Sequence, residues 1–269
     1  MRSQFAETAS RIVMEDEKAV LLLGDIGVFA FRHLLKDFPL RAYNIGILEQ
    51  STIGLASGLA LSGHYPIIHT IAPFLIERAY EQIKVDLAYQ QLGCNLISVG
   101  GSYDYAGLGC THHCPADVAI LNKIPSLEII VPGHKKEFDK LLSSNYDNSF
   151  TSYFRLSESS NLENRDVEFG KNIIIQEGNK LTVVAVGPML DSVIEACEGL
   201  DVSILYCTTV KPFDSSYISN NHNDKTVIVE PYYSGPILTN IEKKLGGLCG
   251  SYMNIGVPDD FIRKYGSKE

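Results

Sequence analysis

The stretch Arg41-Ala-Tyr-Asn-Ile-Gly-Ile-Leu-Glu-Gln50 joins a segment with strand character to one with helical character. Residues 41–47 alternate polar and apolar side chains, as a strand end does, and the small and apolar residues of 51–62 predict a helix. Glu49 stands between the two. It is either a first-turn carboxylate stabilised by the helix N-terminus, or a carboxyl in an apolar pocket, where desolvation favours the protonated form.

The same alternation of strands and helices extends in both directions. We expect strands at 19–24, 65–71, 95–100, 127–131 and 152–156, and helices at 2–16, 74–91, 117–123 and 135–144. The pattern restarts with strands at 172–176, 181–187, 202–206, 226–230 and near Tyr252, and with helices at 189–197 and 236–245. This predicts an α/β fold of two consecutive domains, each a mostly parallel sheet with helices on both faces. The polar stretch 157–166 has no usable period, so we expect domains at 1–157 and 171–269 with a linker at 158–170.

The composition excludes several classes of protein. A net charge of -9 without a basic run argues against a nucleic-acid-binding surface. No apolar stretch approaches the roughly 20 residues of a membrane span, and the N-terminus lacks the apolar core of a signal peptide. The six cysteines are mostly scattered beside apolar neighbours, which indicates buried free thiols in a reducing compartment, and a cytoplasmic protein is the expectation.

Two short motifs could carry chemistry. Gly24-Asp-Ile-Gly27 follows the first strand, so Asp25 stands where ligand sites of open α/β sheets lie, although an Asx-turn or a helix N-cap is the slightly favoured interpretation. Cys110-Thr-His-His-Cys114 has the residue types of a zinc site, but its spacing fits zinc poorly. A Gly-rich loop that presents His112 and His113 to a substrate is the better interpretation, and a surface loop with solvated imidazoles is the plain one.

Three further side chains have a structural and a functional interpretation. Phe74 and Tyr80 are six residues apart on an expected helix and would ordinarily be core aromatics, yet one of them could stack on a flat ligand. Arg155 ends an apolar strand, where a guanidinium could grip a phosphate or a carboxylate, or could form an ordinary surface ion pair.

The order of the motifs carries more information than any one of them. Asn44-Ile-Gly-Ile-Leu-Glu-Gln50, Phe74-x5-Tyr80-Glu-Gln, Gly107-x-Gly-Cys-Thr-His-His113 and Ile255-Gly-Val-Pro-Asp-Asp-Phe261 together resemble the C-terminal half of transketolases. The resemblance is closest to the split form, in which this half is a separate polypeptide, and it covers the chain from Arg2 to Phe261. It implies a pyrimidine-binding domain for thiamine diphosphate followed by a transketolase C-terminal domain.

The resemblance also implies roles for cofactor-binding residues. Glu49 matches the glutamate that hydrogen-bonds the ring nitrogen of the aminopyrimidine, and Phe74 matches the aromatic residue that stacks on that ring. Asp25, Ile47 and Tyr80 are expected near the cofactor. Among the neighbours of Glu49 we expect Ile45, Ile47, Ile53 and Leu55 to shield its carboxyl from water.

The implied substrate residues are His112, His113, Arg155, Arg2 and Leu108. His112 matches the catalytic histidine that polarises or protonates substrate oxygens, and the two arginines stand where the family grips a substrate phosphate. Leu108 replaces the aspartate that would contact a donor hydroxyl, and a second substrate-facing histidine expected earlier in the loop falls at Gly100. Both changes remove polar contacts to a sugar.

The diphosphate-binding half of the family carries Gly-Asp-Gly and, about thirty residues later, Asn. Gly24-Asp-Ile-Gly27 is not that motif. The resemblance therefore implies a partner, the N-terminal transketolase subunit, which holds the diphosphate and Mg²⁺ in an α2β2 assembly. The leading interpretation is the C-terminal subunit of a split transketolase that transfers a two-carbon ketol unit between sugars or sugar phosphates. The alternatives are the β subunit of a 2-oxo-acid dehydrogenase and a non-catalytic regulatory partner of a related enzyme.

Overall fold

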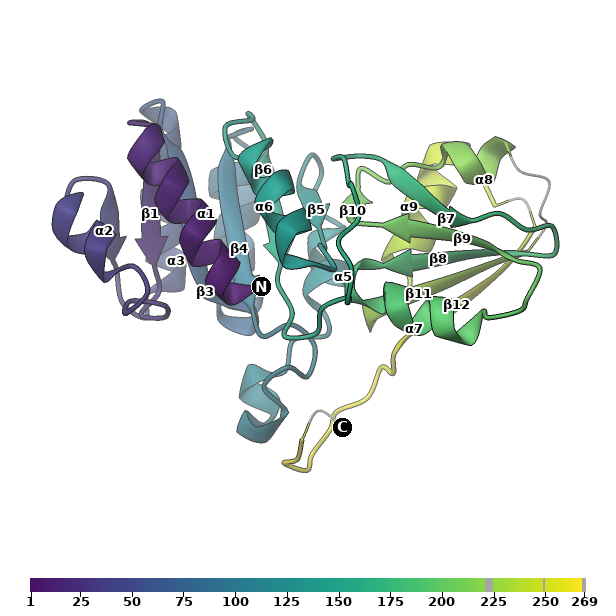
Figure 1. The fold of residues 1–269 in the computed structure, drawn as a ribbon. Helices are drawn as coiled ribbons and strands as arrows, with labels where there is room; N and C mark the ends of the chain where they lie inside the picture. Colours follow the sequence, from purple (N-terminus) through teal and green to yellow (C-terminus); the bar gives the residue numbers. More distant parts are fainter. Residues whose placement is uncertain (221–224, 249, 268–269) are drawn as a thin grey trace.

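Two sheets form the centre of the molecule (Figure 1). The computed structural model describes residues 1–220, 225–248 and 250–267. The seven-stranded sheet has the order β10-β5-β6-β4-β3-β1-β2, with β1 (Ala19–Leu23), β2 (Ala42–Asn44), β3 (Tyr65–Ile71), β4 (Cys94–Val99), β5 (Glu128–Ile130), β6 (Thr151–Arg155) and β10 (Thr209–Lys211). The five-stranded sheet has the order β12-β11-β8-β9-β7, with β7 (Asn172–Gln176), β8 (Thr182–Val186), β9 (Ser203–Cys207), β11 (Lys225–Tyr233) and β12 (Ser251–Val257).

Helices cover both faces of the two sheets (Figure 1). The α-helices are α1 (Arg2–Glu15), α2 (Arg32–Asp37), α3 (Glu49–Leu61), α4 (Tyr80–Gln82), α5 (Asp117–Leu121), α6 (Lys135–Ser143), α7 (Leu190–Ala196), α8 (Ser216–Asn220) and α9 (Pro236–Leu245). The short 3-10 turns are η3 (Ala106–Leu108), η4 (Cys110–His112) and η5 (Gly187–Met189). None of the helices in the described residues combines the length and the apolar character that crossing a membrane requires.

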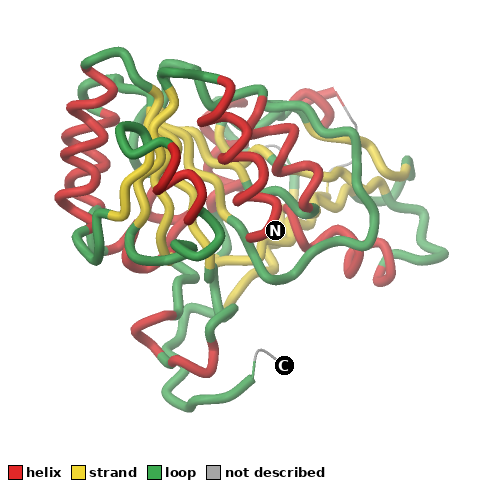
Figure 2. The backbone as a smooth tube through the Cα atoms, turned by 60° about the vertical axis from the view of Figure 1, so that its left-hand side comes forward, coloured by secondary structure: helices red, strands yellow, loops and turns green. Residues whose placement is uncertain are grey.

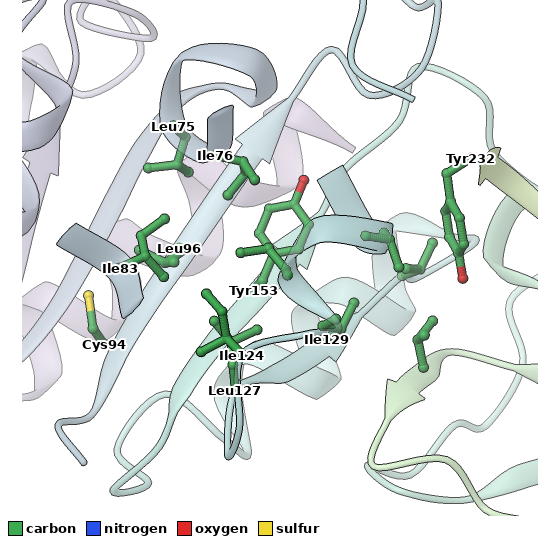
Figure 3. Packing of buried hydrophobic residues seen from close by; sticks show 14 of the residues in the cluster. Leu75, Ile76, Ile83, Cys94, Leu96, Ile124, Leu127, Ile129, Tyr153 and Tyr232 are labelled. Carbon is green, nitrogen blue, oxygen red and sulfur yellow. The ribbon is translucent and has the colours of Figure 1, made fainter. Parts of the chain in front are cut away.

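The apolar strands explain this layered arrangement. All five residues of β1 are buried, as expected of a parallel strand covered on both faces. One apolar core includes Phe5 of α1 and Phe138 of α6, and the other includes Ile53 of α3 and Ile237 of α9. Figure 3 shows part of the second core, which contains Ile129 and Tyr153 of the first sheet as well as Tyr232 of β11. The predicted α/β fold with two mostly parallel sheets is therefore confirmed.

The long helix expected at 74–91 is a broken one. It consists of the π-helix η1 (Pro73–Glu77), the single turn α4 and the π-helix η2 (Ile83–Ala88). In a π turn each backbone hydrogen bond spans one residue more than in an α turn, and such turns are frequent at functional sites. An apolar period alone does not distinguish these wide turns from an α-helix, so the sequence predicted a continuous helix.

The second half of the chain also contributes to the first sheet. Strand β10, which the sequence pattern did not predict, pairs antiparallel with β5 at the edge of that sheet. The Tyr206 hydroxyl donates to Glu137 Oε2 at 2.6 Å, and Glu137 accepts the backbone N–H of Gly133 at 3.0 Å. Residues 156–171, which connect β6 to β7, contain no helix or strand, but Val167 within them is buried. The limits of the two domains and of the linker remain predictions.

The topology brings several loops to one edge of the first sheet. Strands β1, β2, β3 and β4 run parallel, so their carboxyl ends meet at the same edge. Asn44 is the last residue of β2, and Asp25, η1 and the loop that contains η3 and η4 follow the ends of β1, β3 and β4. Figures 1 and 2 both show this loop and the C-terminal segment extending from the same side of the molecule.

Candidate active site

Glu49 begins helix α3 and is buried. Its side chain is only 4% exposed, and its two carboxylate oxygens each lie 3.1 Å from Nη1 of Arg78. The helix N-terminus also favours a negative charge at this position. Glu49 is therefore a buried carboxylate with a cationic partner, which combines features of both interpretations offered by the sequence.

Arg78 links Glu49 to Phe74. The guanidinium carbon of Arg78 lies 4.1 Å from the centroid of the Phe74 ring, a cation–π contact. Phe74 lies within η1 and Arg78 follows it, four residues along, so both side chains project from the same side of the turn. The sequence motifs gave Arg78 no role, although it lies within the motif Phe74-x5-Tyr80-Glu-Gln.

His112 approaches the same aromatic ring. Its ring centroid lies 5.1 Å from that of Phe74, with an angle of 71° between the planes. The Thr111 hydroxyl lies 2.9 Å from His112 Nδ1. Three of the residues proposed from the sequence, Glu49, Phe74 and His112, therefore come together, with Arg78 between the first two.

Asp25 supports the turn that leads to Glu49. Its backbone N–H donates to Asn44 Oδ1 at 3.0 Å, and Asn44 Nδ2 donates to Asp25 Oδ1 at 3.0 Å. Asn44 Oδ1 also accepts from the backbone N–H of Gly46 at 3.3 Å. Asp25 itself is exposed and has a positive φ of 58°. The two side chains tie the carboxyl ends of β1 and β2 together directly before α3.

The apolar shield expected around Glu49 is only partly present. Ile53 is buried, but Ile47 is 65% exposed and Leu55 is 44% exposed, so much of these two side chains faces solvent. The expectation rested on neighbours in sequence, whereas the ion-pair partner of Glu49, Arg78, comes from another loop. Tyr80 is half-buried, with its hydroxyl 3.4 Å from the Ile120 carbonyl, and its cofactor role remains a prediction.

Arg155 is buried, at the wall of a cavity of about 420 Å³ that Ser102 and Asp104 also line. Its side chain is 1% exposed, and its Nε donates to Asp117 Oδ2 at 2.8 Å. Its Nη2 donates to the Ser102 hydroxyl at 2.6 Å. Burial lowers the pKa of Arg155, but the acidic groups around it, Asp117 first among them, together hold that pKa above its ordinary value. The interpretation of Arg155 as part of an ordinary surface ion pair is therefore wrong. Its role in binding a substrate phosphate remains a prediction, which these contacts do not favour.

The other substrate candidates surround the loop after β4. His113 is buried, with its ring centroid 4.9 Å from that of Tyr103, whereas Arg2 and Leu108 are exposed. A cavity of about 340 Å³ beside His113 is lined by Glu77, Cys110 and Asp260 among others. Burial raises the pKa of Glu77, whose Oε1 lies 3.6 Å from the Cys114 thiol.

The cysteines differ in part from expectation. Cys94, Cys114, Cys197 and Cys207 are buried free thiols, but Cys110 is exposed. Cys249 lies outside the described residues. Among the residues that the structure describes, no group of histidine, cysteine, aspartate and glutamate side chains is arranged to hold a metal ion.

Glu49, Phe74 and His112 thus lie at the carboxyl edge of a parallel sheet, where the ligand sites of such folds lie. Comparison with known proteins identifies the family. Residues 1–162 match the family "Transketolase, pyrimidine binding domain", and residues 170–268 match "Transketolase, C-terminal domain". The chain belongs to the transketolase family.

Individual proteins are similar to this chain over nearly its whole length. An "Uncharacterized 33.6 kDa protein in fasciation locus" of Rhodococcoides fascians is 35% identical over 274 residues, which cover 100% of this chain and 88% of that protein. One of the subunits of the apulose-4-phosphate transketolase of Phocaeicola vulgatus is 30% identical, covering 97% of this chain and 88% of that one. A solved "Split gene transketolase, inactive beta4 tetramer" has the same fold, with a TM-score of 0.84 at 24% identity over 96% of this chain and 89% of that chain.

Proposed function

We propose that this chain is the pyrimidine-binding subunit of a two-chain, thiamine-diphosphate-dependent transketolase. The observation that carries the proposal is the grouping of Glu49, Phe74 and His112 at the carboxyl edge of the first sheet. The guanidinium of Arg78, which contacts both Glu49 and Phe74, provides evidence that a planar, N–H-bearing group fits between them.

Each residue has a task in this proposal. Thiamine diphosphate, when bound, supplies the electron sink that lets a carbon–carbon bond of a ketose break. Glu49 holds a carboxyl oxygen at the ring nitrogen of the aminopyrimidine and shares a proton there. Phe74 orients the ring by stacking. Because Thr111 engages His112 Nδ1, the Nε2 of His112 is left to exchange a proton with a substrate oxygen.

The proposal includes a partner subunit that holds the diphosphate and Mg²⁺, in an α2β2 assembly. Two observations support a partner subunit. Ile47, Leu48 and Leu55 are exposed beside Glu49, and large apolar side chains grouped on a surface mark sites of protein association. The Phocaeicola vulgatus relative is itself named as one subunit of a larger enzyme.

The test is to combine the purified chain with a candidate partner that contains Gly-Asp-Gly, about thirty residues and Asn. We expect the mixture, with thiamine diphosphate and Mg²⁺, to transfer two-carbon units from a ketose or ketose phosphate to an aldose. Pyruvate and other 2-oxo acids serve as alternative donors in the same assay. Turnover of 2-oxo acids alone would favour the dehydrogenase-type interpretation, and a mixture that binds no cofactor would overturn the proposal.

A further inference from the structure

We propose that Arg78 occupies the binding position of the aminopyrimidine in the unassembled chain, so that the cofactor ring must displace it. This inference rests on the proposed function and adds a residue that regulates access to its site. Two contacts define this binding position: a hydrogen bond to the Glu49 carboxylate and a contact with the Phe74 ring. Arg78 makes both, at 3.1 Å and 4.1 Å respectively.

The chemistry of the guanidinium explains why it can stand in for such a ring. It is planar, carries N–H donors at its edge and stacks on aromatic faces. An aminopyrimidine is also planar and also presents nitrogen at its edge. Because Glu49 and Phe74 each meet the guanidinium, the two groups compete for the same carboxylate and the same aromatic ring.

Arg78 has a second effect, which is to compensate the charge of Glu49 before the cofactor arrives. A carboxylate that is 4% exposed and has no partner is costly, because burial removes its water. The positive charge of Arg78 offsets this cost in the free chain. When the pyrimidine ring takes over the carboxyl, this compensation is no longer needed.

The exposure of Arg78 distinguishes it from Arg155, which also pairs with a buried carboxylate. The Arg78 side chain is 46% exposed, so its head can move into water. In the Arg155–Asp117 pair, by contrast, the side chains are 1% and 0% exposed, and Ser102 also holds the guanidinium. The first pair can therefore open, whereas the second is fixed within the fold.

The test measures binding of thiamine, which lacks the diphosphate, to the isolated full-length chain by isothermal titration calorimetry. The Arg78→Ala variant is expected to bind thiamine about tenfold more tightly than the wild type, a difference of about 1.4 kcal/mol. Adding Glu49→Gln to this variant should abolish the gain. Arg32→Ala is the matched control, since Arg32 also lies 4.1 Å from a phenylalanine ring, that of Phe29, but away from Glu49. Its affinity should stay within about twofold of the wild type.

Equal or weaker thiamine binding by Arg78→Ala, including an absence of binding in both proteins, overturns the inference. If that variant does not fold, Arg78→Lys replaces it, because lysine keeps a positive charge near Glu49 but lacks the planar fork. This variant should bind thiamine about threefold more tightly, and an unchanged affinity overturns the inference.

A parallel titration of thiamine diphosphate and Mg²⁺ into the wild-type chain with its partner separates the two proposals. If the wild-type pair binds the cofactor but the isolated Arg78→Ala chain does not bind thiamine more tightly, only the role of Arg78 is refuted. If Arg78→Ala binds thiamine more tightly but the mixture transfers no two-carbon units, only the transketolase proposal is refuted.

Discussion

The buried histidine of β3 predicts how the stability of the chain depends on pH. His69 is fully buried, its Nδ1 lies 3.0 Å from the Ile97 carbonyl, and its ring centroid lies 4.4 Å from that of Phe5. Among the described residues, its Nε2 has no hydrogen-bond partner. Burial lowers the pKa of His69 from 6.5 to about 4, and the positive charge of Arg2 adds to this effect. The neutral imidazole is therefore the folded form.

The sign and size of the effect follow from these two pKa values. Between pH 6.5 and 4 the unfolded chain binds a proton at this residue and the folded chain does not, so stability falls as the pH falls. At pH 5 the loss amounts to about 2 kcal/mol relative to pH 8. With a urea m-value of about 3 kcal/mol/M, the unfolding midpoint should move down by roughly 0.7 M.

The assay is urea unfolding, followed by circular dichroism, at pH 8 and pH 5. Because other groups also titrate in this range, the decisive quantity is the difference between variants. His69→Asn should be less stable than the wild type at pH 8 but should lose about 2 kcal/mol less on acidification. His33→Asn, at an exposed histidine, should follow the wild type at both pH values. The same pH dependence in His69→Asn and the wild type would refute the reasoning.

Three further substitutions test the site and its support. Asp117→Ala leaves the guanidinium of Arg155 buried and unpaired, so the free energy of unfolding should fall by about 3–5 kcal/mol in chemical denaturation; a loss below about 1 kcal/mol would contradict the enclosed ion pair. His112→Asn should lower kcat of the assembled enzyme by roughly 10²–10⁴-fold while cofactor affinity, measured by calorimetry, changes little; an unchanged kcat would exclude proton transfer by His112. Asn44→Ala removes the paired hydrogen bonds to Asp25, so it should lower the free energy of unfolding by about 1 kcal/mol and weaken cofactor binding several-fold. Unchanged cofactor binding would show that these hydrogen bonds do not position the site.

Much of the fold was predictable because its strands are distinctive in sequence. β1 reads as a continuous apolar run and is buried throughout, as a strand covered on both faces should be. β10 is only three residues long and pairs with a strand about eighty positions earlier, so no local pattern reveals it. The breaks in the expected helix at 74–91 were also hidden, because π turns differ from α turns by a single residue per turn.

The candidate site was predictable in its parts but not in its contacts. Glu49, Phe74 and His112 were each chosen from motifs, and they do meet. The partner of Glu49 is separated from it by 29 positions, and nothing local to either residue pairs them. Arg155 shows the reverse case: a strand-end arginine looks available in the sequence, yet Asp117 and Ser102 enclose it. Exposure depends on packing between distant segments, which residue type alone does not reveal.

The central claim is that this chain provides half of a thiamine diphosphate site. The most direct measurement is a calorimetric titration of thiamine diphosphate with Mg²⁺ into this chain alone, the candidate partner alone, and the mixture. We predict tight binding, with one cofactor per pair of chains, only in the mixture, and loss of two-carbon transfer in Glu49→Gln with the assembly intact. Tight binding of the cofactor by this chain alone, or full turnover in Glu49→Gln, would contradict the claim.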